Sequence, residues 1–596
     1  MLLYIIKIIK NNTIKKKSLI SVILLITLFT ISSCSKNKSH KNKIPDVIHT
    51  SHLPSGWYTQ EKQQLSQEID LYLASAKKAF DVTVDPATIK ALIVPHAGHY
   101  YSGLCAASAY QTLQNQNAIP DRKNQSINRV IILAPSHTHF FNGVSLPYYT
   151  KYQTVLGDLQ VETQAITLLS KNQLFKQFED AHMQEHAIEV QLPFLQKTIA
   201  NFTIIPLIVG HIKDITEYYQ IAEQIKKVMT DQTLIVVSSD FLHYGKNYDF
   251  VPFGRNIIDN IRFLDSLVIQ AITAQSLNLF NNVLLETNAT VCGREPIKIL
   301  LALLEAQVFN NHKKRTTNNS NKNQENHGEN LANNNNRDNN NRDNNIIETR
   351  LACYYTSAHV PGARKNNLFD SNALFATIPD GAVSNSVSYA GLIFTSQQLS
   401  ELKKEARLTG YEKKALLKLA RTSVKNEFQD QTTRTPEHLL APIVSPGIEQ
   451  KTGAFVTLTS KNHNLRGCIG RIISNDPLYT TVRAMSKAAA FNDSRFSPVT
   501  PQELENLRFD ISVLSQPERI SSVVDIQLGK HGIILTKLGL NNHPLGAAVF
   551  LPQVPVENRW NLETTLEHLS EKAGFDKTAW QHDCAFEVFE GFEIKE

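Results

Sequence analysis

The sequence predicts two folded domains: an α/β domain with a mostly parallel sheet and flanking helices, followed by a separate α+β domain. Three observations predict this. Short apolar runs alternate with longer amphipathic stretches up to about residue 308, an asparagine-rich segment then interrupts the pattern, and a mixed order of strands and helices begins near residue 411. At 596 residues, the chain is also longer than one hydrophobic core normally organises.

The first residues have the pattern of an export signal. Lys15, Lys16 and Lys17 precede an apolar run that is too short to span a bilayer comfortably and ends in Ile31-Ser32-Ser33-Cys34. This ending resembles the lipobox of bacterial lipoproteins, in which the cysteine is acylated. We favour it over an uncleaved anchor, because a thiol at this place has little other use. We therefore expect a lipoprotein signal peptide (1–34), a flexible tether (35–45), and an exported protein anchored by lipid on Cys34 to the periplasmic or cell-surface side of a bacterial membrane.

Charge and cysteine content limit the partners. The formal net charge is +6, but residues 1–45 hold nine lysines and no acidic residue, so the rest of the chain carries −3. A mildly acidic body argues against a nucleic-acid surface, and no nucleic-acid partner is expected. The five cysteines that follow Cys34 show no CxxC spacing, so their pattern predicts no disulfide framework.

The first domain is predicted to span residues 46–395. Its near-continuous apolar runs are typical of strands buried on both faces, and they lie at residues 91–95, 130–135, 202–210 and 234–240. Helices are expected between them, at residues 103–115, 189–198 and 215–229. Residues 309–349 are rich in asparagine and cannot bury enough apolar surface to order themselves, so we expect a disordered insertion.

The second domain is predicted to span residues 411–596, after a charged linker at 396–410. Its expected strands read GAFVTLTS, LRGCIGRII and LRFDISVLS, and its expected helices read PLYTTVRAMSKAAAF and ETTLEHLSEKAG. This mixed order is typical of an α+β domain.

Histidines follow several of the expected parallel strands. His96, His137 and His243 come directly after three of the apolar runs, and His211, after another, either joins them or is merely exposed. Because the carboxyl ends of parallel strands meet at one edge of a sheet, metal binding or acid–base chemistry is favoured over solvated loop histidines.

A further cluster, HMQEHAIEV, adds to these histidines. Within it His182 and His186 are four residues apart, as are Glu185 and Glu189, so one helix would place each pair on one face. The two histidines could then chelate a metal, although exposed helical histidines are the more common case.

Six motifs in a fixed order carry a resemblance to a known family. They read IVPHAGHYYSG, LAPSHTHFFNGVSLP, EHAIEVQLPFL, IIPLIVG, VVSSDFLHYG and TVCGREPI. Together with SHLPSGWYTQ they resemble the Memo family, whose fold is similar to the LigB-type class III extradiol dioxygenases. The resemblance covers residues 46–395 apart from the insertion.

The resemblance implies one metal ion held by His96, His137 and Cys292. Two imidazoles and a thiolate favour iron or copper, and zinc also fits. Three protein ligands leave a coordination position open for a substrate or dioxygen. Without the resemblance, Cys292 would be interpreted as a buried small apolar residue.

The resemblance also implies residues around the ligands. His186, Asp240 and His243 match motif positions that would either support the ligands or serve as acid and base. Behind them we expect Glu189, Glu295 and His99 to support the site. Two positions depart from the family pattern: Glu295 stands where the motif commonly has histidine, and His99 stands where tyrosine is common. A carboxylate at 295 would favour a harder metal or could itself ligate.

The second domain resembles the AMMECR-type domain through LRGCIG and its neighbouring motifs. Cys468 within LRGCIG is a candidate nucleophile or redox thiol, because Arg466 could lower its pKa and Asp493 or Arg495 could complete a cleft. A buried thiol in a tightly packed turn is an equally weighted interpretation.

The fusion of the two domains resembles the AmmeMemoRadiSam systems, which implies a radical S-adenosylmethionine protein as partner. This chain has no CxxxCxxC cluster, so that chemistry would belong to another polypeptide. We expect metal-dependent redox or dioxygenase-like chemistry on an unknown small-molecule or protein substrate. The alternative is a non-enzymatic module that binds a metal, a peptide or a protein.

Overall fold

A computed structural model describes most of the chain beyond the leader. The described ranges are 46–114, 126–306, 345–365, 368–369, 372–398, 408–430, 434–539 and 543–596. The predicted signal peptide and tether, residues 309–344 of the insertion and residues 399–407 of the linker lie outside them. Residues Ile48–Glu596 form one compact unit.

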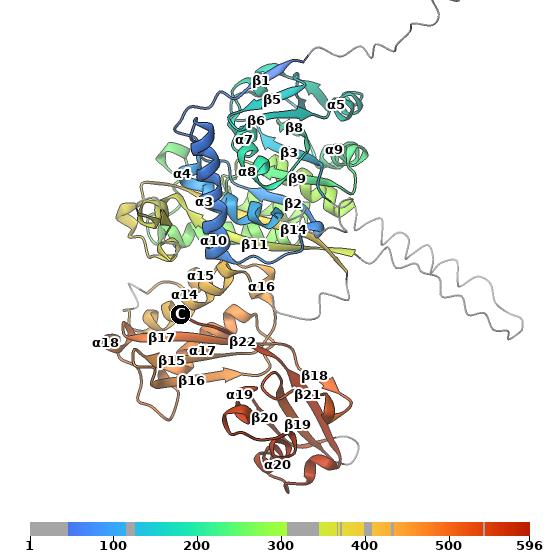
Figure 1. Cartoon of the computed structure of the whole chain (residues 1–596). Helices are drawn as coiled ribbons and strands as arrows, with labels where there is room; N and C mark the ends of the chain where they lie inside the picture. The colour runs from blue at the N-terminus through green and yellow to red at the C-terminus, as the bar shows by residue number, and fades with distance from the viewer. Residues whose placement is uncertain are drawn as a thin grey trace, which may run out of the picture. The chain divides into compact units, whose positions relative to one another are not determined.

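A mostly parallel sheet of twelve strands organises the first domain (Figure 1). Its central neighbours pair in parallel, whereas β14 runs antiparallel to β2. The order along the sheet is β1 (Ile48–Thr50), β5 (Lys151–Thr154), β6 (Gly157–Val161), β8 (Thr203–Val209), β3 (Arg129–Pro135), β9 (Thr233–Ser238), β2 (Ile89–Val94), β14 (Asn385–Gln398) and β10 (His243–Gly245). Beside this path, β11 (Asn345–Thr356) pairs with β14, and β4 (Val144–Leu146) pairs with β7 (Phe175–Gln177) and β8.

The four apolar runs of the sequence are the four inner parallel strands β2, β3, β8 and β9. All six residues of β9 are buried, as are six of the seven in β3 and in β8. Burial on both faces explains why these strands show continuous apolar runs rather than alternation. The predicted fold class is therefore confirmed. One boundary differs: β11 begins at Asn345, so the last five residues of the predicted insertion belong to a strand.

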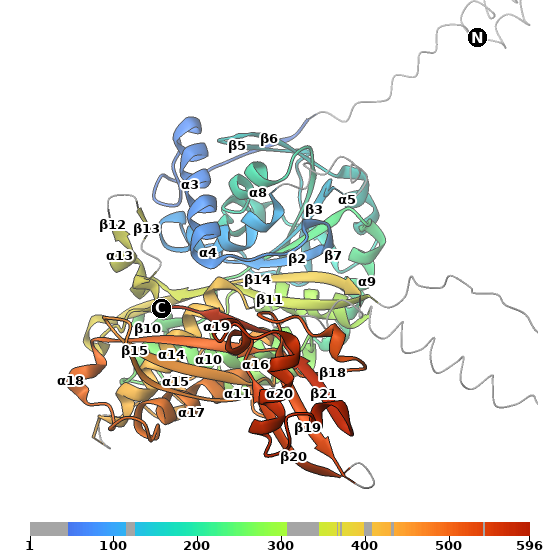
Figure 2. The same ribbon diagram turned by 60° about the horizontal axis from the view of Figure 1, so that its bottom comes forward.

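Helices cover both faces of this sheet. Figures 1 and 2 show α3, α4 and α8 on one side and α5 and α9 on the other. The α-helices are α3 (Lys62–Phe80), α4 (His99–Tyr110), α5 (Thr163–Leu169), α6 (Glu179–Met183), α7 (His186–Glu189), α8 (Leu192–Thr198), α9 (Ile215–Val228), α10 (Ile257–Thr273), α11 (Leu277–Thr287), a helical stretch at 294–306 and α13 (Val360–Ala363).

The single helix expected to carry His182 and His186 is not formed. Gln184 and Glu185 separate α6 from α7, because the Glu185 side chain accepts a hydrogen bond from the N–H of Ala187 and caps α7. His182 is buried beside Tyr149 instead, with 3.4 Å between its Nδ1 and the tyrosine hydroxyl. The prediction that these two histidines share one helical face was wrong.

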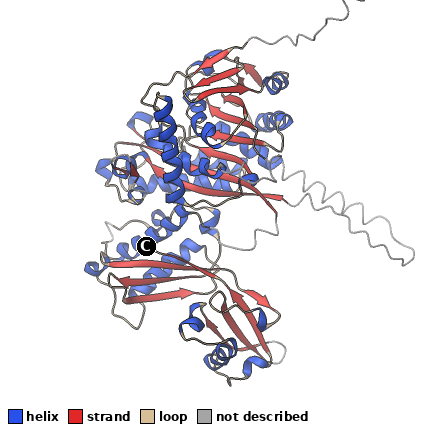
Figure 3. Cartoon of the chain, viewed as in Figure 1, coloured by secondary structure: helices blue, strands red, loops and turns tan. Residues whose placement is uncertain are grey.

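The second domain has the predicted α+β arrangement, with two antiparallel sheets and helices packed against them (Figure 3). One sheet contains β16 (Leu465–Arg471), β15 (Ala454–Ser460), β17 (Leu507–Leu514) and β22 (Gly591–Ile594), and the other contains β18 (Glu518–Ile520), β21 (Cys584–Phe589), β19 (Gly532–Leu538) and β20 (Pro544–Phe550). Its helices are α14 (Gly410–Glu427), α15 (Glu437–Leu440), α16 (Pro446–Glu449), α17 (Leu478–Phe491), α18 (Pro501–Leu504), α19 (Gln553–Glu557) and α20 (Leu562–Lys572). Within the described ranges, no helix has the length and apolar character needed to cross a bilayer.

Candidate metal centre

Two strand ends and one turn bring His96, His137 and Cys292 together. His96 lies two residues after β2, His137 two residues after β3, and Cys292 lies on the turn that precedes the helical stretch 294–306. One donor atom from each of the three residues lies within 4.8 Å of the other two. His96 Nε2 and Cys292 Sγ are 3.1 Å apart.

Gly293 allows the Cys292 turn to approach the end of β9 this closely. The N–H of Gly293 donates to Ser239 Oγ at 3.1 Å, and a Cβ at this position would lie 2.3 Å from the side chain of Ser239. A larger residue would have to displace that serine, so the sequence CGR specifies where the thiol sits.

Ser238 fixes which nitrogen of His96 faces the cluster. The Ser238 hydroxyl donates to the carbonyl of Ala187 at 2.7 Å, so its oxygen acts as the acceptor towards His96 Nδ1 at 3.0 Å. We therefore assign the ring proton to Nδ1, which leaves Nε2 unprotonated and directed at Cys292. Burial, with a further contribution from His137, lowers the pKa of His96 well below its usual value, and this keeps the ring neutral as ligation requires.

Glu185 orients His137 in the same manner. Its two oxygens accept from the backbone N–H of His137 at 2.7 Å and from Nδ1 of the same ring at 2.9 Å, which again leaves Nε2 available. Burial alone would raise the pKa of Glu185, but the hydrogen bonds and the charge of His137 outweigh it, and the net shift is downward. The carboxylate thus stays ionised and holds the imidazole.

The donor set fits a transition-metal ion. Ligand bonds of about 2.0–2.3 Å place donor atoms about 3–4 Å apart, which agrees with the compact cluster. Burial, together with the nearby Asp240, raises the pKa of the Cys292 thiol well above its usual value, so a cation at this point is what would favour the thiolate. Two imidazoles and one thiolate suit copper, iron or zinc.

His137, Glu185 and His186 form a second group with metal-ligand spacing. Glu185, however, already accepts two hydrogen bonds from His137 and one from the N–H of Ala187 at 3.0 Å. We therefore assign Glu185 the role of orienting His137 and assign the ion to the set that contains Cys292.

His186 stands beside the cluster. Its ring stacks on His137 with 4.5 Å between centroids and lies 4.3 Å from the ring of Trp57. Burial lowers the pKa of His186 to about 4, despite the charge of Glu185. At neutral pH this imidazole is uncharged and can accept a proton only weakly.

Asp240 and His243 follow β9 on the same edge. Asp240 accepts from the backbone N–H of His96 at 2.8 Å, and burial raises the pKa of its carboxyl group. His243 Nδ1 lies 2.8 Å from the carbonyl of Phe241 and 3.0 Å from that of Thr290. Carbonyl oxygens can only accept, so Nδ1 carries the proton and Nε2 remains an acceptor.

The three supporting residues predicted from the sequence lie in different surroundings. Glu189 is a buried hub for the segment before α3, where it accepts from the hydroxyls of Tyr58 and Tyr152 and from the N–H of His52. Glu295 accepts from the Tyr218 hydroxyl on α9 and lies near Arg294 and Lys298. His99 begins α4, donates from Nε2 to the carbonyl of Val190 at 3.0 Å and packs against Tyr58 and Phe194.

The surroundings of Cys468 differ from those expected. Arg466 pairs with Glu503 at 3.1 Å rather than with the thiol, and the Thr457 hydroxyl donates to Sγ at 3.2 Å. Asp493 accepts a hydrogen bond from the N–H of Cys468 at 2.9 Å. The Arg495 guanidinium donates hydrogen bonds to the Asp493 carboxylate and to the carbonyl of Cys468. Asp493 and Arg495 therefore hold the backbone at Cys468.

Three residues of the site were missed in the sequence. Glu185 and Trp57 were visible in EHAIE and SGWYTQ, next to residues that had been selected, but nothing in the pattern said that they touch His137 and His186. Ser238 follows an apolar run as an ordinary strand-end serine, and only the fold brings its hydroxyl to His96.

The fold and this cluster define a two-domain protein whose α/β part has a possible metal site. The family models that match are the Memo-like protein, over residues 52–328, and AMMECR1, over residues 417–594. The memo-1 homolog of Caenorhabditis elegans is 32% identical over 287 residues, which cover 47% of this chain and 77% of that protein. MEMO1 of Homo sapiens is 32% identical over 262 residues, which cover 42% of this chain and 82% of that protein.

A solved structure is also similar, that of an uncharacterized protein from Pyrococcus horikoshii. It is 31% identical, with a TM-score of 0.25, and the match covers 30% of this chain and 88% of that one. On the strength of the sequence matches, the chain belongs to the Memo family and carries an AMMECR1 domain after its Memo-like domain.

The Glu189 hub predicts a specific pH dependence of stability. Burial would raise the pKa of Glu189, but hydrogen bonds from His52, Ser51 and Tyr58 lower it from its ordinary 4.5 to about 2. The folded pKa is depressed, so the stabilisation is present above about pH 4.5 and is lost as the pH falls towards 2. In urea unfolding at neutral pH, the free energy of unfolding of Glu189→Gln should be about 3 kcal/mol lower than that of the wild type.

The difference between wild type and Glu189→Gln should shrink as the pH falls below about 4.5. The matched control is Glu223→Gln on the exposed face of α9, which should change stability by less than about 0.5 kcal/mol. A wild-type advantage that stays constant with pH would show that the charge of Glu189 does not hold this segment.

Proposed function

We propose that the Memo-like domain binds one redox-active metal ion through His96, His137 and Cys292 and performs metal-dependent redox or dioxygenase-like chemistry. Iron or copper is favoured over zinc for this chemistry. The substrate is an unknown small molecule or protein. When bound, the ion would supply electron transfer or the activation of dioxygen at a position that the three protein ligands leave open.

The observation that carries this proposal is the orientation of the two imidazoles. Ser238 and Glu185 each bind an Nδ1, so that both histidines keep an unprotonated Nε2 for the cluster. Histidines that only filled space would not need both tautomers fixed in this way.

The neighbouring residues are suited to handling protons. His137 has a side chain that is 29% exposed, so the cluster is reachable from solvent on that side. His243 offers Nε2 as a proton acceptor, and the raised pKa of Asp240 lets that carboxyl hold a proton more readily than an exposed one. The Trp57 ring lies 4.3 Å from the His186 ring between centroids, tilted by 37°, and covers part of it.

The redox test uses full-length protein purified without oxygen and supplied with iron(II) or copper(I). Elemental analysis should find about one ion per chain in the wild type and much less in Cys292→Ser and His137→Ala. The control is His211→Ala, which changes another strand-end histidine that is exposed. The absorption spectrum of the loaded wild type should respond to oxygen, to a reductant or to a catechol.

Two outcomes would contradict parts of the proposal. Unchanged metal content in both ligand variants would refute the site. If the ion binds but no spectral response follows, the enzymatic function fails and the non-enzymatic binding module remains.

We also propose, from the sequence of the leader, that lipid on Cys34 anchors the protein to a bacterial membrane on its outer side. Cys34→Ser should move the protein from the membrane fraction to the soluble fraction and abolish labelling with a radioactive fatty acid. The control Ser33→Ala retains a small residue before the cysteine, so its membrane recovery and its labelling should equal those of the wild type. Membrane recovery of an unlabelled Cys34→Ser protein would indicate an uncleaved anchor instead.

A radical S-adenosylmethionine protein remains a proposed partner, supported by the fusion of the two domain types. An exported, lipid-anchored chain could not meet a cytoplasmic enzyme. The anchor and this partnership are therefore compatible only if that enzyme acts in the same compartment.

A further inference from the structure

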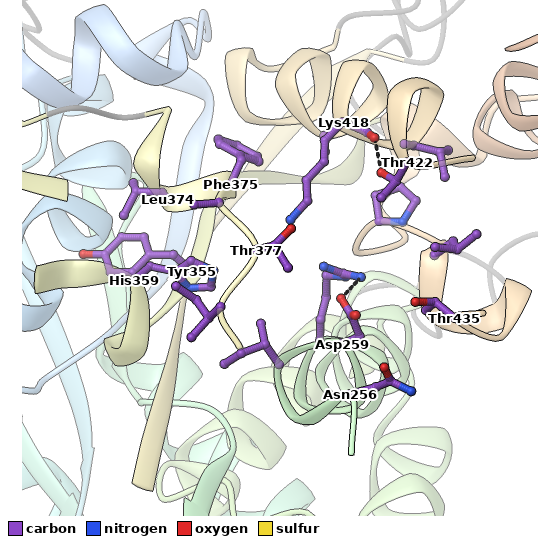
Figure 4. Close-up of a pocket in the computed structure, with 18 of the residues that line it drawn as sticks. Asn256, Asp259, Tyr355, His359, Leu374, Phe375, Thr377, Lys418, Thr422 and Thr435 are labelled. Carbon is purple, nitrogen blue, oxygen red and sulfur yellow. Dashed lines mark hydrogen bonds and ion pairs between the residues drawn. The ribbon is translucent and has the colours of Figure 1, made fainter. Parts of the chain in front are cut away.

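A cavity of about 320 Å³ lies in the compact unit, apart from the His/Cys cluster. It is lined by α10, by α14 and by the segment 374–380, and none of its lining residues belongs to the cluster. Its volume falls at the lower end of the range of small-molecule sites, about 300–1,000 Å³. Figure 4 shows its residues as they project from these elements.

Lys418 places a positive charge in this cavity. Its side chain runs from α14 towards Thr377 (Figure 4), and its ammonium group has no hydrogen-bond or ion-pair partner among the described residues. Burial, and then the charge of Arg262, lowers the pKa of Lys418 to about 8. An ammonium group that is partly buried in a largely apolar cavity and has no partner loses hydration without gaining an ion pair, and an anion would offset that loss.

The acidic groups of the cavity already have partners. Asp259 pairs with Arg262 at 2.7 Å, and Arg262 also donates to the carbonyl of Leu439 at 2.7 Å. Asp380 accepts from the backbone N–H groups of Asn256 and Ile257, both at 2.8 Å, and so caps α10. Neither carboxylate forms an ion pair with Lys418, and the charge of Asp259 offsets the effect of burial on the Lys418 pKa only in part.

The rest of the lining is largely apolar. Phe375 and Tyr411 face each other with 5.4 Å between ring centroids, and Leu374, Ile378 and Leu419 also border the space. An inorganic ion would leave these side chains without contacts. A ligand with an apolar or aromatic body and one anionic group would satisfy both parts of the cavity.

We propose that this cavity binds a small organic anion, a carboxylate or a phosphate monoester, with its anionic group on Lys418 and its apolar body against Phe375 and Tyr411. The site draws on α10 of the Memo-like domain and on α14 at the start of the second domain. It is independent of the metal ion and of the proposed redox chemistry.

The test is isothermal titration calorimetry of the full-length protein with benzoate, phenyl phosphate and the neutral benzyl alcohol. Both anions should bind the wild type at least about 10-fold more tightly than the alcohol, because a hydrogen bond to a charged group is worth that much or more. A preference between benzoate and phenyl phosphate would distinguish the two kinds of anion.

The variants separate charge from packing. Lys418→Met should bind the two anions about 10-fold to 100-fold more weakly than the wild type does and so lose the preference for them. Lys418→Arg should retain most of the anion affinity. Lys413→Met on the same helix does not line the cavity and should bind as the wild type does. Its melting temperature, with that of Lys418→Met, checks that both variants are folded.

Three results would overturn the proposal. They are no measurable binding of either anion to the wild type, equal binding of the alcohol and the anions, or undiminished anion binding by a folded Lys418→Met protein.

Discussion

The parallel register of β3, β9 and β2 is the constraint on which the rest of the Memo-like domain depends. Val94 pairs with Ser238, and Leu133 pairs with Val237, so the three strands end at one level. The residues that follow must then meet at one edge, and these include His96, His137 and Asp240. A shift of one strand by a residue would turn its side chains to the other face and separate these groups.

Polar contacts behind the ligands determine what the cluster can do. The rings of His96 and His137 are oriented because Ser238 and Glu185 bind their Nδ1 atoms. Each contact comes from a different element, β9 for the serine and the residue before α7 for the glutamate. The site is therefore a product of the fold rather than of any one motif, and loss of either partner would disorder a ligand without removing it.

The sequence predicted the fold class well because burial on both faces leaves a clear mark on a strand. The predicted boundaries of β2, β3, β8 and β9 lie within two residues of the observed ones, and the family motifs identified His96, His137 and Cys292 as candidate ligands. Contacts between residues distant in the sequence could not be predicted. The capping of α7 by Glu185 broke the helix expected to carry His182 and His186, and the pairing of Arg466 with Glu503 removed that arginine from Cys468. Such choices depend on neighbours distant in sequence, which spacing does not reveal.

The measurement that tests the central claim most directly is X-ray absorption spectroscopy at the metal edge of full-length protein purified without oxygen. If His96, His137 and Cys292 are the ligands, one sulfur should appear at about 2.3 Å and nitrogen ligands at about 2.0 Å. Cys292→Ser should lose the sulfur contribution, whereas Cys468→Ser should retain it. A coordination shell made only of nitrogen and oxygen in the wild type would contradict the assignment of the thiol, and with it this metal centre.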